Sequence, residues 1–263
     1  MIDPSLGFTD FHVHLDLVDP ARVATGGLAR VLDLGSAAAV AAGDVEVVRA
    51  GRMLTAVGGY PSTRPWAAVG LFREVAEGEA DAAVAEQVAA GAAVIKIALN
   101  TAAGPVWPDA VLASVVNVAH SAGLKVVAHV EGAGQSLRAV TAGVDAFAHA
   151  PFTERLGDDL IARLATHTTW ISTLRIHEGR ERDRAIDNLR RFRTAGGRIL
   201  YGTDMGNGGS SGGVERDELE ALIEADLTPD ELLTALTGGP LLPPLSDVDR
   251  AAARDAIADL IGG

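Results

Sequence analysis

Cysteine is absent from the sequence, and lysine occurs only twice, as Lys96 and Lys125. Without cysteine the protein has neither disulfides nor thiolate metal ligands, so any metal must be bound by histidine, carboxylate or a modified lysine. No run approaches the roughly 18 uncharged apolar residues that a membrane-spanning helix needs. Residues Met1–Pro4 show neither the basic nor the apolar segment of a signal peptide. We therefore expect a cytoplasmic protein without a membrane anchor.

Positive charge is also scarce, since the formal net charge is −13 at pH 7. Negative charge repels phosphate backbones and anionic lipid surfaces, which argues against nucleic acid and membrane as partners. The 263 residues, 48% of them hydrophobic, supply enough apolar surface for one large core. We expect a single domain over residues 1–263 that acts on a small molecule, and the composition leaves a homo-oligomer open.

Short apolar runs alternate with stretches of helical character along the chain. The predicted strands are residues 8–14, 30–34, 53–58, 93–98, 124–130, 146–149, 169–173 and 198–203. The predicted helices are residues 37–49, 79–90, 108–121, 134–142, 156–166, 182–195, 215–224 and 229–236, with a closing helix at about 246–261. Alternating strands and helices predict a parallel sheet of the α/β class, and eight strands favour closure into a (β/α)8 TIM barrel.

Three connections are longer than such a barrel needs, namely residues 60–73, 174–180 and 205–213. Each follows a predicted strand. We therefore expect all three on the C-terminal face, where barrels carry their chemistry.

Two histidines occupy alternate positions at the end of the first predicted strand, in the run Phe11-His12-Val13-His14. Side chains alternate with a period of two along a strand, so His12 and His14 point the same way and make a suitable pair of metal ligands. Taken alone, the pair is also explained by two ordinary polar residues at a strand end.

Lys96 lies inside an otherwise aliphatic run, Ala93–Leu99. An ammonium group is costly to bury there unless it is paired or neutralised. Reaction with CO2 would convert the amine into an anionic carbamate able to bridge two metal ions. An ion pair with a carboxylate, or a Schiff-base lysine of the kind found in barrel aldolases, would also explain the residue.

Three more metal-competent side chains end other predicted strands: His129, His149 and Asp204. A lone histidine on an apolar strand is usually structural. Five of the eight predicted strands, however, end in or near such a group, and chance does not readily place them all at one end of a barrel. The combination predicts a metal site.

This set resembles the signature of the binuclear amidohydrolases: HxH on strand one, lysine on strand four, histidines on strands five and six, and aspartate on strand eight. The resemblance covers roughly residues 7–240. The run Gly202-Thr203-Asp204 and the helical segments after it are closest to the imidazolonepropionase- and prolidase-like branches. Many members add a small β-sandwich built from both chain ends, and here we expect the barrel without it.

The resemblance implies a metal-dependent hydrolase with two divalent ions. The implied ligands are His12, His14 and Asp204 for one ion, His129 and His149 for the other, and carboxylated Lys96 with a hydroxide as the bridge between them. The hydroxide would attack an amide, lactam, ester or lactone, and Asp204 would carry its proton to the leaving group. Zinc suits such ligands best, while Mn, Fe and Co stay open.

Other polar residues after the predicted strands are candidates for substrate binding: Tyr60, Asn100, Arg175 and His177. Turn formation or an ordinary solvated loop would also explain them. Glu131 is either a partner of the metal ligands or a loop charge.

Three other functions compete. A mononuclear deaminase of the same superfamily shares the HxH pair but typically has glutamate three residues after the strand-five histidine, where this chain has Gly132. A metal-binding barrel without catalysis is disfavoured by the complete ligand set. A Lys96 Schiff-base lyase would leave four histidines without a role.

Overall fold

Strands and helices alternate along most of the computed structural model, which describes residues 2–67, 70–246 and 248–262. The strands are β1 (Thr9–Val13), β2 (Arg30–Asp33), β3 (Glu46–Arg49), β4 (Met53–Ala56), β5 (Phe72–Val75), β6 (Val94–Asn100), β7 (Lys125–Glu131), β8 (Ala146–Phe147), β9 (Thr169–Ile171) and β10 (Arg198–Leu200). The α-helices are α1 (Pro20–Ala24), α2 (Ala80–Ala89), α3 (Asp109–Ser121), α4 (Gln135–Ala142), α5 (Asp158–His167), α6 (Gly179–Thr194), α7 (Arg216–Glu224), α8 (Pro229–Thr237) and α9 (Arg250–Gly262). Short 3₁₀ helices are η1 (Pro4–Leu6), η2 (Leu15–Leu17) and η3 (Leu174–Ile176).

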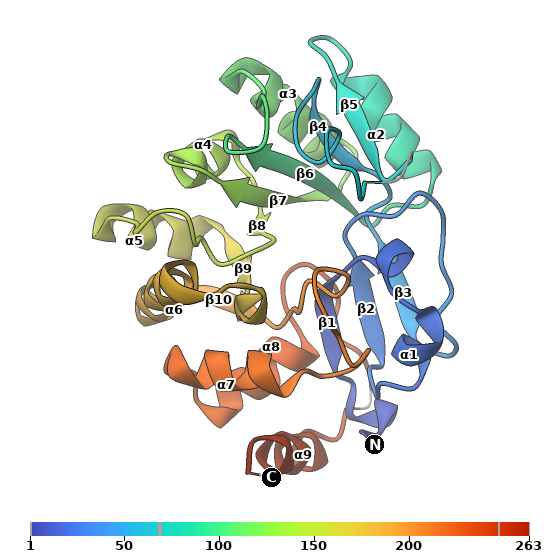
Figure 1. The fold of residues 1–263 in the computed structure, drawn as a ribbon, viewed down its shortest axis with the longest axis vertical. Coiled ribbons are helices and arrows are strands. Elements are labelled where there is room, and N and C mark those ends of the chain that lie inside the picture. The colour runs from blue at the N-terminus through green and yellow to red at the C-terminus, as the bar shows by residue number, and fades with distance from the viewer. Residues whose placement is uncertain (1, 68–69, 247, 263) are drawn as a thin grey trace.

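The strands form two parallel sheets, with the orders β1-β2-β3 and β10-β9-β8-β7-β6-β4-β5. Backbone hydrogen bonds connect the sheets on both sides. The N–H of Ala93 donates to Arg49 at 2.9 Å, and on the other side Phe11 donates to Tyr201 at 3.0 Å and His14 to Met205 at 2.7 Å. Figure 1 shows the strands grouped around the centre with helices outside them. The predicted α/β fold with a parallel sheet is confirmed.

An apolar layer fills the space that the strands enclose. It takes side chains from seven of the ten strands in the described part of the chain: Phe11, Leu32, Val94, Val127, Ala146, Ile171 and Leu200. Because side chains on a strand alternate, Lys96 on β6 lies on the same side as Val94, and His129 on β7 on the same side as Val127. The core layer therefore sets the direction in which these two polar side chains point, one step nearer the carboxyl ends of the strands.

The helix predicted over residues 37–49 is wrong. Residues 37–45 contain bends and turns, and β3 follows at Glu46–Arg49, paired with β2. The alanine-rich run favours a helix by only a few tenths of a kcal/mol per residue, so strand pairing overrides it. Gly43 has a φ of 61°, and a Cβ there would come within 2.8 Å of Ala24 Cβ, so the turn before β3 favours glycine.

Besides β3, the helix α1 and the strand β5 also have no counterpart among the predicted elements. β5 pairs with β4 at the sheet edge and overlaps the expected long loop 60–73, of which residues 68 and 69 lie outside the described ranges. The last helix, α9, begins at Arg250 rather than near residue 246, and Asp247 of the predicted range also lies outside the described residues. α9 packs against α8 and η1, so the two ends of the described chain lie together (Figure 1).

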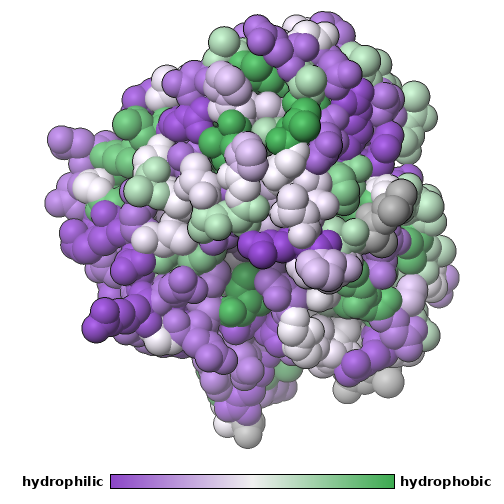
Figure 2. All heavy atoms as spheres, turned by 45° about the horizontal axis from the view of Figure 1, so that its top comes forward, coloured by the Kyte–Doolittle hydropathy of each residue, from purple (hydrophilic) through white to green (hydrophobic). Residues whose placement is uncertain are grey.

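The surface is mixed in character. Figure 2 shows hydrophobic residues in small patches among hydrophilic ones. Large exposed apolar side chains in the described part of the chain are Leu17, Val57, Trp66, Val88, Leu137 and Ile223. Within the same residues, no helix is both long enough and apolar enough to cross a bilayer.

A buried carboxylate, Glu218 of α7, connects that helix to the turn after β9. Its Oε2 accepts the backbone N–H of Arg175 at 2.8 Å, and its side chain is fully buried. Burial raises the pKa of Glu218 to about 7, although hydrogen bonds from Ser172 and Arg175 oppose the rise. The folded protein therefore keeps a proton on Glu218 at pH values where the unfolded chain has released it.

Because the folded-state pKa is raised, Glu218 contributes stability that is complete below about pH 4.5 and is lost as the pH rises through 7. Glu218→Gln removes this titration. We expect its free energy of unfolding, relative to wild type, to rise by about 2–3 kcal/mol from pH 4 to pH 8, or roughly 5–10 °C in Tm. Thermal melts at both pH values measure the change, with Glu220→Gln on the exposed side of α7 as control. A difference independent of pH would contradict the assignment.

Candidate metal centre

Three metal-competent side chains meet at the carboxyl end of β1. Nε2 of His12 lies 3.2 Å from Nε2 of His14 and 3.1 Å from Oδ1 of Asp204, and His14 Nε2 lies 3.3 Å from the same oxygen. Ligands at roughly 2.0–2.2 Å around a tetrahedral ion stand about 3.3 Å from one another. These three predicted residues therefore form a group that can hold a metal ion.

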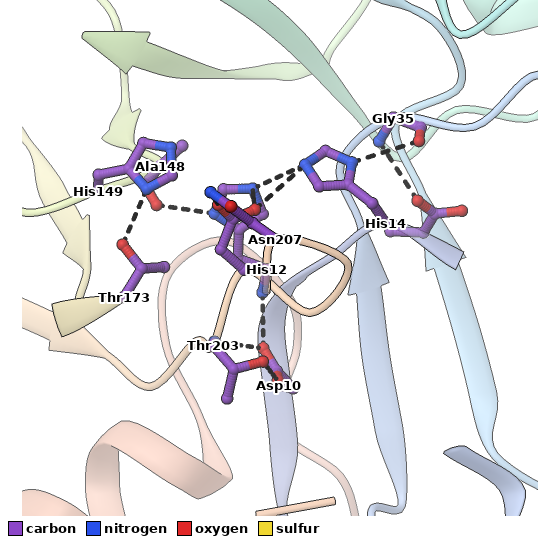
Figure 3. Close-up of polar contacts among 11 residues, drawn as sticks. Asp10, His12, His14, Gly35, Ala148, His149, Thr173, Thr203 and Asn207 are labelled. Carbon is purple, nitrogen blue, oxygen red and sulfur yellow. Dashed lines mark hydrogen bonds and ion pairs between the residues drawn. The ribbon is translucent and has the colours of Figure 1, made fainter. Parts of the chain in front are cut away.

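Asp10 fixes the backbone under this group. Its Oδ1 accepts the N–H of His12 at 2.9 Å and that of Thr203 at 3.1 Å, and its Oδ2 accepts the Thr203 hydroxyl at 2.6 Å (Figure 3). Burial raises the pKa of Asp10 to about 7, although these hydrogen bonds oppose the rise. Asp10 thus joins β1 to the segment that carries Asp204.

The backbone at both ends of this junction departs from regular strand geometry. The β1–β2 register is irregular between Asp10 and Val13, and such bulges re-aim side chains near active sites. Asp204 has a φ of 52°, a left-handed conformation rare outside glycine, and Asn207 Nδ2 donates to its Oδ2 at 3.0 Å. Both departures direct ligand atoms toward the same point.

Backbone carbonyls set the tautomers of the two histidines. Nδ1 of His12 is 2.8 Å from the Ala148 oxygen, and Nδ1 of His14 is 3.3 Å from the Gly35 oxygen (Figure 3). A carbonyl only accepts, so each Nδ1 carries the proton and each Nε2 presents its lone pair to the centre. Burial lowers the pKa of His12 well below its usual value, which keeps the ring neutral as a metal ligand requires.

Lys96 lines the same cavity as the other predicted ligands. Its side chain is about 1% exposed, and Nζ has no hydrogen-bond partner in the described part of the chain. Burial lowers the pKa of the amine to about 7, although the charge of Asp204 opposes this. An unpartnered buried amine is costly, and an anionic carbamate with metal ions beside it would remove that cost.

His149 and His129 complete the predicted ligand set. The ring of His149 lies 4.8 Å from that of His12 and 4.9 Å from that of His129, measured between centroids. Nδ1 of His149 is 2.8 Å from the hydroxyl of Thr173, which has a φ of 45°. Burial, with His12 nearby, lowers the pKa of His149 well below its usual value and keeps it neutral.

The surroundings of His129 differ from those of the other three histidines. Its Nε2 lies 3.1 Å from Oε2 of Glu131, and Asn100 Nδ2 donates to that oxygen at 2.5 Å. The ring of Tyr60 stacks on the imidazole with centroids 4.9 Å apart. The predicted candidates Asn100 and Tyr60 thus both lie beside His129.

A cavity of about 470 Å³ opens over these residues. It is lined by the six predicted ligands and by Leu17, Met53, Tyr60, Trp66, Glu131, Phe152, Ile176, His177, Gly206 and Asn207. His177 packs on Phe152 with ring centroids 4.1 Å apart, and burial lowers its pKa to about 4. Its Nε2 has no partner among the described residues, which leaves it available to a bound molecule.

Arg175 holds a neighbouring loop. Its guanidinium donates to the carbonyl of Gly209, within the glycine-rich segment that follows Asp204, and its backbone N–H donates to Glu218.

Some residues of the site were not predicted from the sequence, namely Asp10, Thr173, Phe152 and Asn207. Only Asp10 has a local signal, because it lies two residues before His12.

Solved structures share this fold. A Xaa-Pro dipeptidase with bound methionine matches with a TM-score of 0.69 and 20% identity, over 88% of this chain and 73% of that chain. The ochratoxinase of A. niger matches with a TM-score of 0.69 and 20% identity, over 88% and 69% of the two chains. Phenylurea hydrolase B matches with a TM-score of 0.64 and 16% identity, over 94% and 74%. At these identities the likeness shows the fold alone.

No curated protein matches the sequence. The sequence profile of the Amidohydrolase family, by contrast, matches residues 5–241, which is most of the chain. Members of this family generally bind metals, in keeping with the group formed by His12, His14 and Asp204. The chain therefore belongs to the Amidohydrolase family and is a hydrolase.

Proposed function

We propose that this hydrolase uses two divalent metal ions, bridged by a carboxylated Lys96, to cleave an amide, lactam, ester or lactone bond. The observation that carries the proposal is a buried amine without a hydrogen-bond partner in the described part of the chain, which lines one cavity together with two groups of potential ligands. These groups are His12, His14 and Asp204 on one side, and His129 and His149 on the other. Nitrogen and carboxylate donors favour zinc, with Mn, Fe and Co as alternatives.

The bound ions would supply an activated water molecule and polarise the substrate carbonyl. Asp204 would take the proton released by the attacking water and deliver it to the leaving group. The hydrogen bond from Asn207 to Oδ2 fixes the carboxylate plane. Oδ1, which faces both His12 and His14, is then directed toward the reacting atoms.

Tyr60 and His177 line the cavity and would contact the substrate directly. Asn100 and Arg175 are further substrate-binding candidates that would act indirectly. Asn100 orients the Glu131 carboxylate, and Arg175 holds the glycine-rich loop in place. Among the structural neighbours are a Xaa-Pro dipeptidase and a putative prolidase from Bifidobacterium longum. A prolidase-like specificity is therefore the first to test.

Metal analysis and an activity screen test the function together. Protein reconstituted with zinc or manganese is expected to bind about two ions per chain and to hydrolyse at least one of four substrate classes: dipeptides, N-acyl amino acids, lactams and lactones. A metal content near zero would remove the metal claim. A content of one would favour the mononuclear alternative.

Lys96→Ala should lose the second ion while it keeps the first. The amine of Lys96 attacks CO2, releases a proton and becomes the carbamate, so the alanine variant lacks the bridging oxygens. Short carboxylic acids such as acetate are expected to restore part of the binding, because they can fill the same space with a carboxylate. Metal content after dialysis, with and without acetate, is the measurement. Lys125→Ala, the other lysine of the chain, is the matched control and should bind like wild type.

Asp204→Asn should lower kcat by roughly 10²–10⁴-fold, the usual loss for a general acid–base residue. Asparagine keeps the shape and one oxygen ligand but cannot accept the proton. Circular dichroism and metal content should stay near wild type, which separates lost chemistry from lost structure. The control is Asp259→Asn, an exposed position on α9. Wild-type turnover in a folded Asp204→Asn protein would remove Asp204 from the mechanism.

A further inference from the structure

β7 repeats, with one substitution, the arrangement that β1 uses for its metal ligands. At the end of β1, His12 and His14 are two residues apart, and their Nε2 atoms are 3.2 Å from each other. On β7, His129 and Glu131 are two residues apart, and Nε2 of the histidine is 3.1 Å from Oε2 of the glutamate. Both separations match the distance of about 3.3 Å between neighbouring ligands of a tetrahedral ion.

The contact between His129 and Glu131 also has to be reconciled with a metal. If His129 coordinates through Nε2, that atom carries a lone pair and cannot donate a hydrogen bond. A carboxylate oxygen 3.1 Å from a lone pair is then repelled unless a cation or an N–H donor stands beside both. The amide Nδ2 of Asn100, 3.3 Å from Nε2 and 2.5 Å from Oε2, offers such a donor, but it carries no charge. Among the described residues, no lysine or arginine forms an ion pair with Glu131, whose ion-pair contact is with His129. A shared metal ion supplies the missing positive charge.

Asn100 holds the Glu131 carboxylate in this position. The two residues are partners in the β6–β7 register, and Nδ2 of Asn100 donates to Oε2 at 2.5 Å. Oδ1 of Asn100 accepts the N–H of Ala102 at 3.0 Å, so the amide is oriented with its donor toward the glutamate. Partners that orient metal ligands in this way are a regular part of metal sites.

We propose that Glu131 is a ligand of the second metal ion, together with His129, and that Asn100 is its positioning residue. The proposal rests on the binuclear site of the proposed function. It adds an anionic ligand beside His129. The Glu131 side chain is 23% exposed and lines the cavity, so the substrate would enter next to it.

The test is a cobalt and zinc titration of the purified full chain, with binding followed by calorimetry and by the visible absorption of bound Co²⁺. In Glu131→Gln, the first ion should bind as in wild type. The second should bind at least about 10–100-fold more weakly, the loss seen even for residues that only orient a ligand. The absorption of the second Co²⁺ should change as well. Asn100→Ala should weaken the same step to a smaller extent.

The matched control is Glu178→Gln, an exposed glutamate that follows His177. Circular dichroism of the metal-free proteins checks folding, and Glu131→Ala replaces the glutamine variant if that one is unstable. A wild-type protein that binds only one ion would remove the binuclear function itself. Two ions in wild type, with unchanged affinity and unchanged Co²⁺ absorption in Glu131→Gln, would overturn the ligand role alone and leave the proposed function standing.

Discussion

The site depends on the junction between β1 and the segment after β10. These segments are far apart in the sequence, yet Asp10 binds the backbone of both His12 and Thr203. The adjacent main chains exchange hydrogen bonds through Met205 as well, with His14 donating to it and Met205 donating to His12. Without this junction the two histidines and Asp204 would not share a centre. The same contacts link the ends of the two sheets, so the fold and the site share one set of interactions.

Buried polar groups at the centre work against stability. Lys96 has an unpartnered amine, and His177 has an unpartnered ring nitrogen, both in the described part of the chain. A protein interior normally pairs such groups, because each unpaired one costs about 1–3 kcal/mol. Both side chains line one cavity. Barrel enzymes hold their chemistry in such a cavity, at the carboxyl ends of their parallel strands. Asp204 likewise has a strained backbone with a positive φ, and such strain is also common at functional sites.

Much of the ligand group could be predicted because each residue follows an apolar run, and the carboxyl ends of parallel strands converge. His12, His14 and Asp204 indeed lie together. Glu131 has a visible signal in its spacing from His129, but its contact with Asn100 depends on the β6–β7 register, which the sequence does not show. Thr173 has no local signal, since its role depends on a left-handed turn after β9.

The helix predicted over residues 37–49 shows where prediction from local sequence fails. Local alanine content favours helix there, but the chain forms bends and turns before β3, which pairs with β2. Arg49 accepts a hydrogen bond from Ala93, and Ala50 donates to Asp33, so this stretch joins the two sheets. Such a requirement belongs to the closed arrangement of strands and is invisible in a local window.

The central claim is that two metal ions share the cavity with Lys96 between them. Anomalous diffraction from crystals of the zinc-loaded protein, collected on both sides of the zinc absorption edge, tests it most directly. The account predicts two peaks, one within roughly 2.0–2.2 Å of ligand atoms of His12 and Asp204 and the other equally close to His129 and His149. Density should extend beyond Nζ of Lys96 toward both peaks. A single peak, or a free Lys96 amine in a fully metal-loaded crystal at neutral pH, would contradict the account.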